Sequence, residues 1–296
     1  MRFLVFCASV LLTSPSGARA AEVKSVLIFA VDGLRANVLR ASTPPHFATF
    51  IRNGSYSLHA RGVMPTVTFP NFASMISGAG PEQHGVTSND WKPDKFTIAP
   101  QCAGRDGHFP TIFGLLKAAR PDAKSAMFFD GDGFPFIAEV GLPDKIGTAK
   151  GPDPTFDIAV DYLTTERPAL LFLHVDLLDH AGHTEGWESP VYAGEFQHTD
   201  ELLGKLMARL ADAKMLDSTV VFISADHGGV GKRHGGNSMT EIEIPWLVSG
   251  PGIAKGREIT VPVNTFDTAA TIARIYGLKP SACWIGRPVV EALEPR

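Results

Sequence analysis

The stretch TVVFISADHGGVGKRHGG, residues 219–236, joins an apolar run to a cluster of chemically active residues. The run at 219–225 is continuous and of strand length, which is typical of a strand buried on both faces of a parallel sheet. Asp226 and His227 follow it directly, and the two glycines after them allow the chain to bend. His234 comes seven residues after His227. The stretch therefore predicts a buried strand whose carboxyl end carries a carboxylate and imidazoles.

Two other apolar runs end in a similar way. Residues 25–31 form a continuous apolar run that ends on Asp32, and residues 169–175 form another that Asp179 follows. In open parallel sheets, ligands bind beyond the carboxyl ends of the strands. We therefore expect Asp32, Asp179 and Asp226 to lie at the ligand-binding edge of one sheet.

Helical patterns alternate with these runs along the chain. The length and the 44% hydrophobic content suit one large domain and exclude a disordered or fibrous chain. This alternation predicts the α/β class, as a three-layer α/β/α sandwich with a mostly parallel central sheet. Residues 79–110 are rich in Gly, Pro and polar residues, and we expect them to form an irregular excursion beside the active site. Further strands are expected at 125–129 and 244–249, a turn at 130–133, and helices at 43–53, 68–77, 109–119, 154–165, 191–213 and 267–276.

The first 20 residues have the pattern of a secretory signal peptide. Arg2 supplies the positive charge, residues 3–12 the apolar core, and Ala18-Arg19-Ala20 a cleavage site. The apolar core is too short to span a bilayer, so we expect cleavage after Ala20, with an uncleaved anchor as the alternative. We expect residues 21–296 to form a single domain, periplasmic or secreted, without stable membrane insertion.

Net charge and cysteine content limit the binding partners and the disulfides that the chain can have. Without residues 1–20, which carry two arginines and no acid, the formal net charge is −6. Such a chain is not expected to bind nucleic acid through a basic surface, and an anionic substrate would be held by bound metals instead. Export would allow Cys102 and Cys283 to form a disulfide, but their separation in sequence does not show whether they meet.

Carboxylates and imidazoles occur in numbers that suit two divalent metal ions. Asp179 and His183 stand four residues apart, a spacing that turns both side chains towards one ion on a single helical turn or in a tight loop. Asp226 and His227 are adjacent, and His234 lies between glycines and basic residues. Each pair alone is equally compatible with ordinary polar residues after a strand. Their joint occurrence favours a two-metal site, for which zinc suits the ligands and manganese is the alternative.

A threonine is the candidate nucleophile. Thr68 is expected at the start of a helix, where backbone N–H groups and the helix dipole favour anionic oxygens. A metal would lower the pKa of its hydroxyl and make it reactive. Thr68 is also expected to cap this helix, and capping alone would explain its presence. Thr66 is the competing candidate, and spacing does not separate the two.

Five segments together resemble a known family. They are VDGL (31–34), TFPN (68–71), PEQHGVTSN (81–89), DHAGH (179–183) and ADHG (225–228). Their order is similar to that of the nucleotide pyrophosphatase/phosphodiesterase branch of the alkaline phosphatase superfamily, which implies an alkaline phosphatase-like catalytic domain. The resemblance implies that Thr68 is the nucleophile and that Asn89 donates a hydrogen bond to a phosphoryl oxygen. It also implies a first metal held by Asp32, Thr68, Asp226 and His227, and a second held by Asp179, His183 and His234.

The chain departs from this family in two places. His234 follows the Asp-His-Gly motif at once, whereas many members place the corresponding histidine after a long insert. The compact arrangement is more similar to the cofactor-independent phosphoglycerate mutase and phosphopentomutase branches, and it implies a reduced substrate pocket. Residues 128–132, Phe-Phe-Asp-Gly-Asp, stand where relatives often have an aromatic-Pro-Gly-Ser turn, so recognition of a nucleobase is not implied.

Other residues near these motifs allow two interpretations each. Phe69 and Trp91 could stack on a nucleobase or aryl leaving group, or pack against the excursion. A further set could orient the metal ligands or be purely structural: His174, Asp176 and His180. Basic residues of the excursion could reach a terminal phosphate or be solvated surface charge: Lys92, Lys95 and Arg105.

The leading functional hypothesis is hydrolysis of a phosphodiester or phosphoanhydride through a covalent phospho-threonine. The expected partner is a small phosphorylated substrate, such as a nucleotide, and the sequence makes no prediction of oligomeric state. A phosphomonoesterase and a phosphonate hydrolase of the same superfamily are the enzymatic alternatives. A sulfatase is disfavoured because the chain has no C-x-P-x-R motif. A non-catalytic exported protein that binds metal or phosphate is the alternative from another class.

Overall fold

Strand β1 (Ser25–Val31) is buried along its whole length and lies inside an eight-stranded sheet. The structure is a computed structural model that describes residues 22–130, 134–139 and 141–295. The strand order is β4-β3-β5-β1-β6-β7-β2-β8. The remaining strands are β2 (Gly54–Arg61), β3 (Ser125–Phe128), β4 (Lys145–Gly147), β5 (Leu170–Val175), β6 (Thr219–Ser224), β7 (Glu243–Ser249) and β8 (Arg257–Glu258).

The sheet is parallel except for β7, which runs antiparallel to both of its neighbours, β6 and β2. β1 pairs in parallel with β5 and with β6. The registers match Val31 with Val175 and Ala30 with Ser224, so these strands end at the same level. The residues that follow the three strands are therefore brought together at one edge of the sheet.

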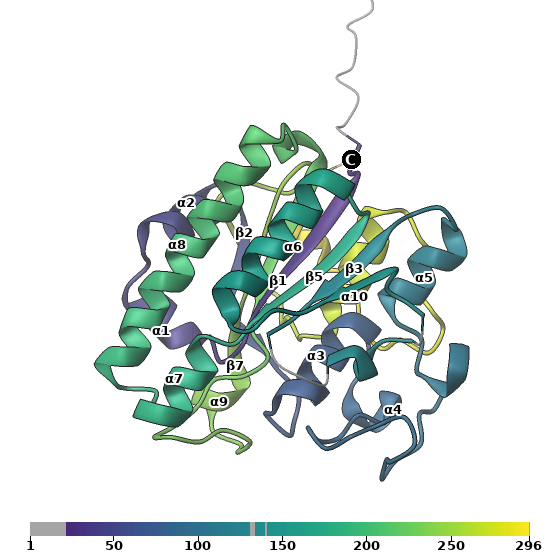
Figure 1. The fold of residues 1–296 in the computed structure, drawn as a ribbon, viewed down its shortest axis with the longest axis horizontal. Helices are drawn as coiled ribbons and strands as arrows, with labels where there is room; N and C mark the ends of the chain where they lie inside the picture. The colour runs from purple at the N-terminus through teal and green to yellow at the C-terminus, as the bar shows by residue number, and fades with distance from the viewer. Residues whose placement is uncertain (1–21, 131–133, 140, 296) are drawn as a thin grey trace, which may run out of the picture.

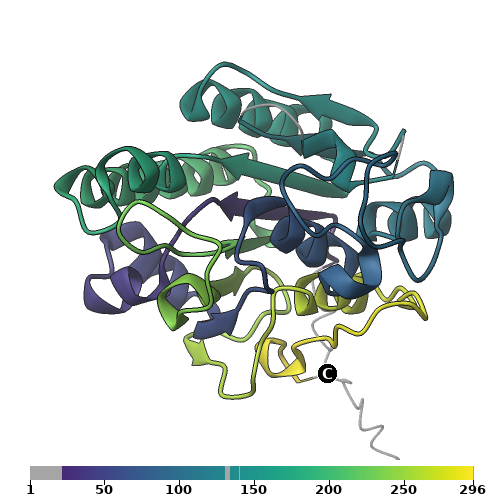
Figure 2. The ribbon, with the colours of Figure 1, turned by 90° about the horizontal axis from the view of Figure 1, so that it is seen from below.

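Helices cover both faces of the sheet, which gives the predicted three-layer α/β/α architecture (Figures 1 and 2). Helices α6, α7 and α8 lie over one face, and α3, α5 and α10 lie over the other. The helix bounds are α1 (Ala36–Ala41), α2 (Pro45–Arg52), α3 (Thr68–Ser77), α4 (Pro81–His84), α5 (Ile112–Ala119), α6 (Pro152–Glu166), α7 (Leu178–Glu185), α8 (Pro190–Asp212), α9 (Met239–Ile242) and α10 (Asp267–Ile275).

The structure contains elements that the sequence did not predict. Strand β2 was not predicted, because its alternating residues are half polar and resemble a connecting loop. It pairs with β7 and β8, so only long-range partners make it a strand. The short helix α1 was also missed. The predicted turn at 130–133 and the predicted signal peptide fall mainly or wholly outside the described residues.

The excursion at 79–110 is largely irregular, as expected, apart from α4 and one 3₁₀ turn at Arg105–Gly107. A disulfide joins Cys102 in the excursion to Cys283, after α10. His84 is buried and its Nε2 lies 2.9 Å from Ser74 Oγ on α3. The excursion is thus fixed to the body of the domain at two points. Among the described residues, no helix has both the length and the apolar content needed to cross a bilayer.

Candidate active site

Asp32 and Asp226 follow the neighbouring strands β1 and β6. The backbone N–H of Gly33 donates to Asp226 Oδ1 at 3.1 Å, so the two strand ends are linked directly. Gly33 has a φ of +70°, and a Cβ atom there would lie 2.9 Å from the backbone N of Asp179. Glycine at this position therefore allows α7 to approach the end of β1.

The first ligand group consists of Asp32, Asp226 and His227, which are 3%, 0% and 0% exposed. Each residue offers one ligand atom that lies within 4.8 Å of those of the other two. In this group, the buried atoms without an assigned hydrogen bond in the described part of the chain are Asp32 Oδ1, Asp226 Oδ2 and His227 Nε2. Outside this group, none of the three buried atoms has a hydrogen-bond partner among the described residues; within it, His227 Nε2 lies 3.0 Å from Asp226 Oδ2 and 3.6 Å from Asp32 Oδ1. Buried polar atoms without partners are unfavourable. A divalent cation would satisfy all three, so the donor set fits a metal site.

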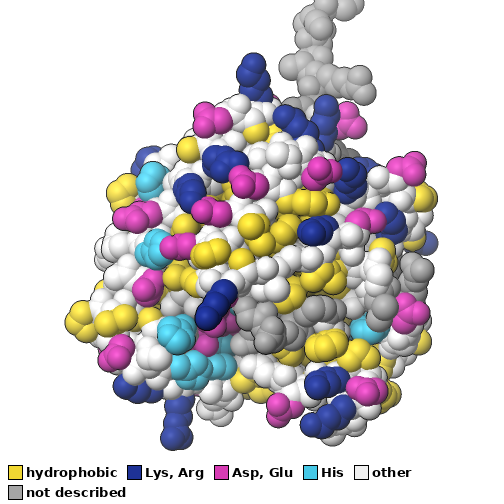
Figure 3. Space-filling model, viewed as in Figure 1, with side chains coloured by type: hydrophobic (Ala, Val, Ile, Leu, Met, Phe, Trp, Pro, Cys, Tyr) yellow, Lys and Arg dark blue, Asp and Glu magenta, His cyan; other side chains and the backbone are white. Residues whose placement is uncertain are grey.

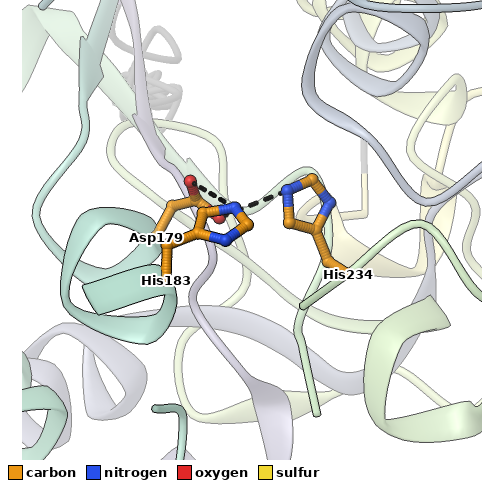
Figure 4. A group of neighbouring side chains, drawn as sticks. All are labelled: Asp179, His183 and His234. Carbon is orange, nitrogen blue, oxygen red and sulfur yellow. Dashed lines mark ion pairs between the residues drawn. The ribbon is translucent and has the colours of Figure 1, made fainter. Parts of the chain in front are cut away.

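The second ligand group consists of Asp179 and His183 on α7 and His234 on the loop after β6 (Figure 4). The Nε2 atoms of His183 and His234 lie 3.5 and 3.6 Å from the two oxygens of Asp179. The side chain of His183 is 44% exposed, and histidine side chains reach the surface together over α7 in Figure 3. The second group is therefore open to solvent on the side of His183, whereas the side chains of Asp179 and His234 are 13% and 10% exposed and the first group is enclosed.

The imidazoles of both groups are oriented in the same way. Each Nδ1 lies within hydrogen-bond distance of a backbone carbonyl oxygen, at 3.0, 3.1 and 2.8 Å. An Nδ1–H that donates to a carbonyl leaves the Nε2 lone pair available to a metal. The pairs, in that order, are His227 with Gly228, His183 with Lys232, and His234 with Thr66.

The two groups are contiguous. Asp32 and Asp179 belong with Asp176 to a third set whose ligand atoms lie within 4.8 Å of one another. The rings of His227 and His234 stack with centroids 3.7 Å apart. Burial, followed by the charges of Asp226 and Asp179, raises the pKa of Asp32 well above its usual value. Burial and the charge of Asp179 likewise raise the pKa of Asp176 to about 7. This density of buried carboxylates is what a pair of dications would neutralise.

The two candidate threonines have different surroundings. The Thr66 hydroxyl is fully buried, donates to Gly236 O at 2.8 Å and accepts from Gly235 N at 3.1 Å. It therefore fixes the loop that carries His234. Thr68 is the first residue of α3, and the cap position belongs to Val67, so the expectation that Thr68 caps this helix is wrong. The structure thus gives a structural task to the hydroxyl of Thr66.

Asn71, in the TFPN segment, is a positioning residue that the sequence reading did not single out. Its side chain is fully buried, its Oδ1 accepts from Val63 N at 2.6 Å, and its Nδ2 donates to Pro65 O and Val67 O at 3.2 and 3.0 Å. It therefore holds the loop that leads to Thr68. The available signal was an amide in the first turn of a predicted helix.

Asn89 lies beside the start of α3. Its Oδ1 accepts a hydrogen bond from Phe69 N at 2.8 Å. This bond uses the acceptor end of the side-chain amide, so the Nδ2 end remains the donor, as the family resemblance implies. Asn89 is exposed, in keeping with access to a substrate.

The remaining predicted residues are placed as follows. Phe69 and Trp91 are 9% and 7% exposed and belong to the hydrophobic core. This placement favours packing over stacking on a substrate. His174 Nε2 lies 3.0 Å from Asp32 Oδ2, a contact that the ligand-orienting interpretation requires. His180, Lys92 and Lys95 are exposed, and the side chain of Arg105 lies outside the described part of the chain.

Comparisons with known proteins agree on one family. The family model described as type I phosphodiesterase / nucleotide pyrophosphatase matches residues 26–234. Mouse ectonucleotide pyrophosphatase/phosphodiesterase family member 1 is 26% identical over 219 residues, which cover 70% of this chain and 24% of the relative. Mouse bis(5'-adenosyl)-triphosphatase enpp4 is 25% identical over 225 residues, which cover 69% of this chain and 46% of the relative. The chain thus spans about a quarter to a half of the length of these relatives.

Solved structures share the fold. An inactive variant of murine ectonucleotide pyrophosphatase/phosphodiesterase 5 in complex with AMP superposes with a TM-score of 0.76 at 16% identity, covering 91% of this chain and 100% of that chain. A mutant of the alkaline phosphatase PafA gives a TM-score of 0.77 at 13% identity, covering 92% of this chain and 99% of that chain. These likenesses show that the fold is of the alkaline phosphatase type.

Proposed function

Because the chain belongs to the type I phosphodiesterase/nucleotide pyrophosphatase family of the alkaline phosphatase superfamily, we propose that it is a hydrolase of phosphodiester or phosphoanhydride bonds that uses two metal ions. The observation that carries the proposal is the contiguity of the two ligand groups, joined through Asp32 and Asp179 and through the stacked His227 and His234. Two adjacent dications suit an in-line displacement at phosphorus.

We assign roles to the residues of this site. Asp32, Asp226 and His227, together with Thr68, would hold the first cation, and Asp179, His183 and His234 the second. When bound, the cations would lower the pKa of the nucleophile and neutralise charge on the leaving oxygen; zinc suits the ligands, and manganese is the alternative.

The protein's own groups would carry the covalent chemistry. The Thr68 hydroxyl loses its proton and its oxygen attacks phosphorus, while the bond to the leaving oxygen breaks and the alcohol or phosphate departs, which gives a phospho-threonine. Water then attacks the same phosphorus and loses a proton, the bond to Thr68 breaks, the threonine oxygen is protonated again, and phosphate monoester is released. Asn89 Nδ2 donates to a phosphoryl oxygen, where charge is largest in the transition state.

The substrate class and cellular location belong to the same proposal. A structural neighbour was solved in complex with AMP, and one relative is named as a bis(5'-adenosyl)-triphosphatase, so a small nucleotide is the substrate we propose.

We also propose that residues 1–20 are a signal peptide and that residues 21–296 form one exported catalytic domain. The Cys102–Cys283 disulfide supports export, because such bonds persist in oxidising compartments.

The experiment that tests the reaction compares two substrates on the purified protein. A nitrophenyl phosphodiester and the corresponding monoester should be hydrolysed in the presence of zinc, with the larger kcat/KM for the diester. A strong preference for the monoester would make the protein a phosphomonoesterase. Absence of turnover with both esters, with dinucleotides and with phosphonate esters would favour the non-catalytic alternative.

A further inference from the structure

Trp187 lies in the connection between α7 and α8 and is 1% exposed. Its backbone N–H donates to Gly231 O at 2.9 Å, and Arg35 Nη1 donates to its carbonyl oxygen at 3.2 Å. Gly231 belongs to the loop that carries His234, and Arg35 follows the turn after β1. The backbone of Trp187 is therefore tied to two of the segments that provide metal ligands.

The indole of Trp187 lies against the imidazoles of the second ligand group. Its ring centroid is 5.3 Å from that of His183 and 6.0 Å from that of His234, with interplanar angles of 78° and 61°. These are edge-to-face arrangements of the kind that stabilise aromatic pairs. Both histidine ligands of the second group therefore rest on one buried ring.

Two glycines of the metal-binding motifs make room for this ring. A Cβ atom on Gly182, the residue before His183, would lie 2.5 Å from the indole. A Cβ atom on Gly229, two residues after His227, would lie 2.3 Å from it. Both distances are far below van der Waals contact. The indole thus occupies the space that side chains at these two positions would need.

We propose that Trp187 is a positioning residue for the second cation, a role that rests on the two-metal function proposed above. The Nδ1 hydrogen bonds of His183 and His234 set which nitrogen faces the cation, and the indole restricts how far each ring can tilt. His183 needs this restraint most, because its side chain is 44% exposed. A ligand ordered before the cation arrives loses less conformational freedom on binding.

The test is a zinc titration of the metal-free full chain by calorimetry. Wild-type protein should bind two cations. Trp187→Phe, which keeps an apolar ring but shortens it, should leave the first affinity unchanged. It should lower the affinity for the second cation by about 10-fold or more, the range seen when residues that orient metal ligands are changed.

The matched control is Trp246→Phe. Trp246 is equally buried, packs edge-to-face on Phe222 with centroids 5.5 Å apart and donates to Thr268 Oγ1, so these contacts of its ring involve no metal-ligand side chain. This variant should lose stability without a change in either cation affinity. If Trp246→Phe lowered the affinity for the second cation as much as Trp187→Phe does, general loss of stability would explain the effect, and the proposal would be overturned.

A second variant keeps Trp187 and changes the space beside its ring. Gly182→Ala should displace the ring and lower the affinity for the second cation. This loss of affinity should be smaller when Gly182→Ala is combined with Trp187→Phe, because the shorter ring leaves space for the added methyl group. Wild-type affinity for both cations in Trp187→Phe would overturn the positioning role alone. A wild-type protein that binds no pair of cations would overturn the two-metal function itself.

Discussion

At the scale of single residues, hydrogen bonds decide which of several similar groups is available for chemistry. Thr66 and Thr68 differ by two positions, yet the hydroxyl of Thr66 is committed to the backbone at Gly235 and Gly236. The same principle sorts the histidines, whose Nδ1 atoms face backbone carbonyls and whose Nε2 atoms face the ligand groups. Reactivity here depends on what each side chain already binds.

Thr68→Ala should abolish turnover while the cations stay bound. Loss of a covalent nucleophile lowers kcat by several orders of magnitude, whereas the carboxylates and imidazoles remain. Turnover of a nitrophenyl diester and elemental analysis of the same sample check both expectations. Thr66→Val is the comparison: it keeps the nucleophile, so turnover should fall far less than in Thr68→Ala, although the loop that carries His234 loosens and about 1–3 kcal/mol of stability is lost. Persistent turnover in Thr68→Ala would rule this threonine out as the nucleophile.

Tyr192→Phe should lower the free energy of unfolding by about 1–3 kcal/mol. The Tyr192 hydroxyl is buried in α8, donates to Gly33 O at 2.7 Å and accepts from Arg35 N at 3.2 Å, so it holds the turn that follows Asp32. Urea denaturation of the metal-free protein measures the change. Tyr162→Phe, at a more exposed tyrosine of α6, should change stability by less than about 0.5 kcal/mol. Equal effects in the two variants would contradict this role for the hydroxyl.

At the scale of elements, the two ligand groups come from different kinds of structure. The first lies at the ends of β1 and β6, which are central strands with buried side chains. The second lies on the eight-residue helix α7 and on an exposed loop. The side chains of Asp32, Asp226 and His227 are at most 4% exposed, whereas that of His183 is 44% exposed. Rigidity and access to solvent should therefore differ between the two groups.

Removal of metal by a chelator should therefore proceed in two phases. The cation on the exposed group should leave first, because the chelator and water reach it directly, and the cation on the enclosed group should leave at a slower rate that depends on local opening. Zinc content measured over time after addition of chelator distinguishes the phases. A single phase that releases both cations together would show that the difference in burial does not control release.

At the scale of the whole molecule, the site exists only when the sheet is assembled. Ligands spread from Asp32 to His234 meet because β5, β1 and β6 are neighbours in the sheet. Cation binding should therefore stabilise the folded chain against unfolding. The excursion is part of the same folded unit through the Cys102–Cys283 disulfide and through His84.

The contribution of His84 to the stability of the metal-free protein should be lost as the pH falls from about 6.5 towards 3. Burial lowers the pKa of His84 from 6.5 to about 3, so below pH 6.5 the unfolded chain binds a proton that the folded chain excludes. The stability contributed by neutral His84 is present above the unfolded pKa and is lost as the pH drops. Denaturation at several pH values should show a weaker dependence in His84→Gln. An identical dependence in the two proteins would exclude His84 as a cause.

Much of the fold was predictable from local patterns. The continuous apolar runs predicted β1, β5 and β6, because a strand buried on both faces must be apolar throughout. The helical spacing of leucines predicted α8, the segment that ends at Gly78 was predicted as the helix α3, and the predicted three-layer class is confirmed. Strand β2 was missed because its residues alternate weakly, and only pairing with β7 and β8 makes it a strand.

The sequence by itself determined which residue types stand at the ends of the strands, and thereby the family and the candidate ligands. Only the tertiary structure decided that Thr66 is committed to the backbone, that Cys102 meets Cys283, and that the indole of Trp187 fills the space beside the motif glycines. The physical reason is the separation along the chain over which each interaction acts. Apolar periodicity and turn chemistry act between near neighbours in the chain, whereas hydrogen-bond partners, disulfides and ring packing depend on segments that meet only after the sheet has formed.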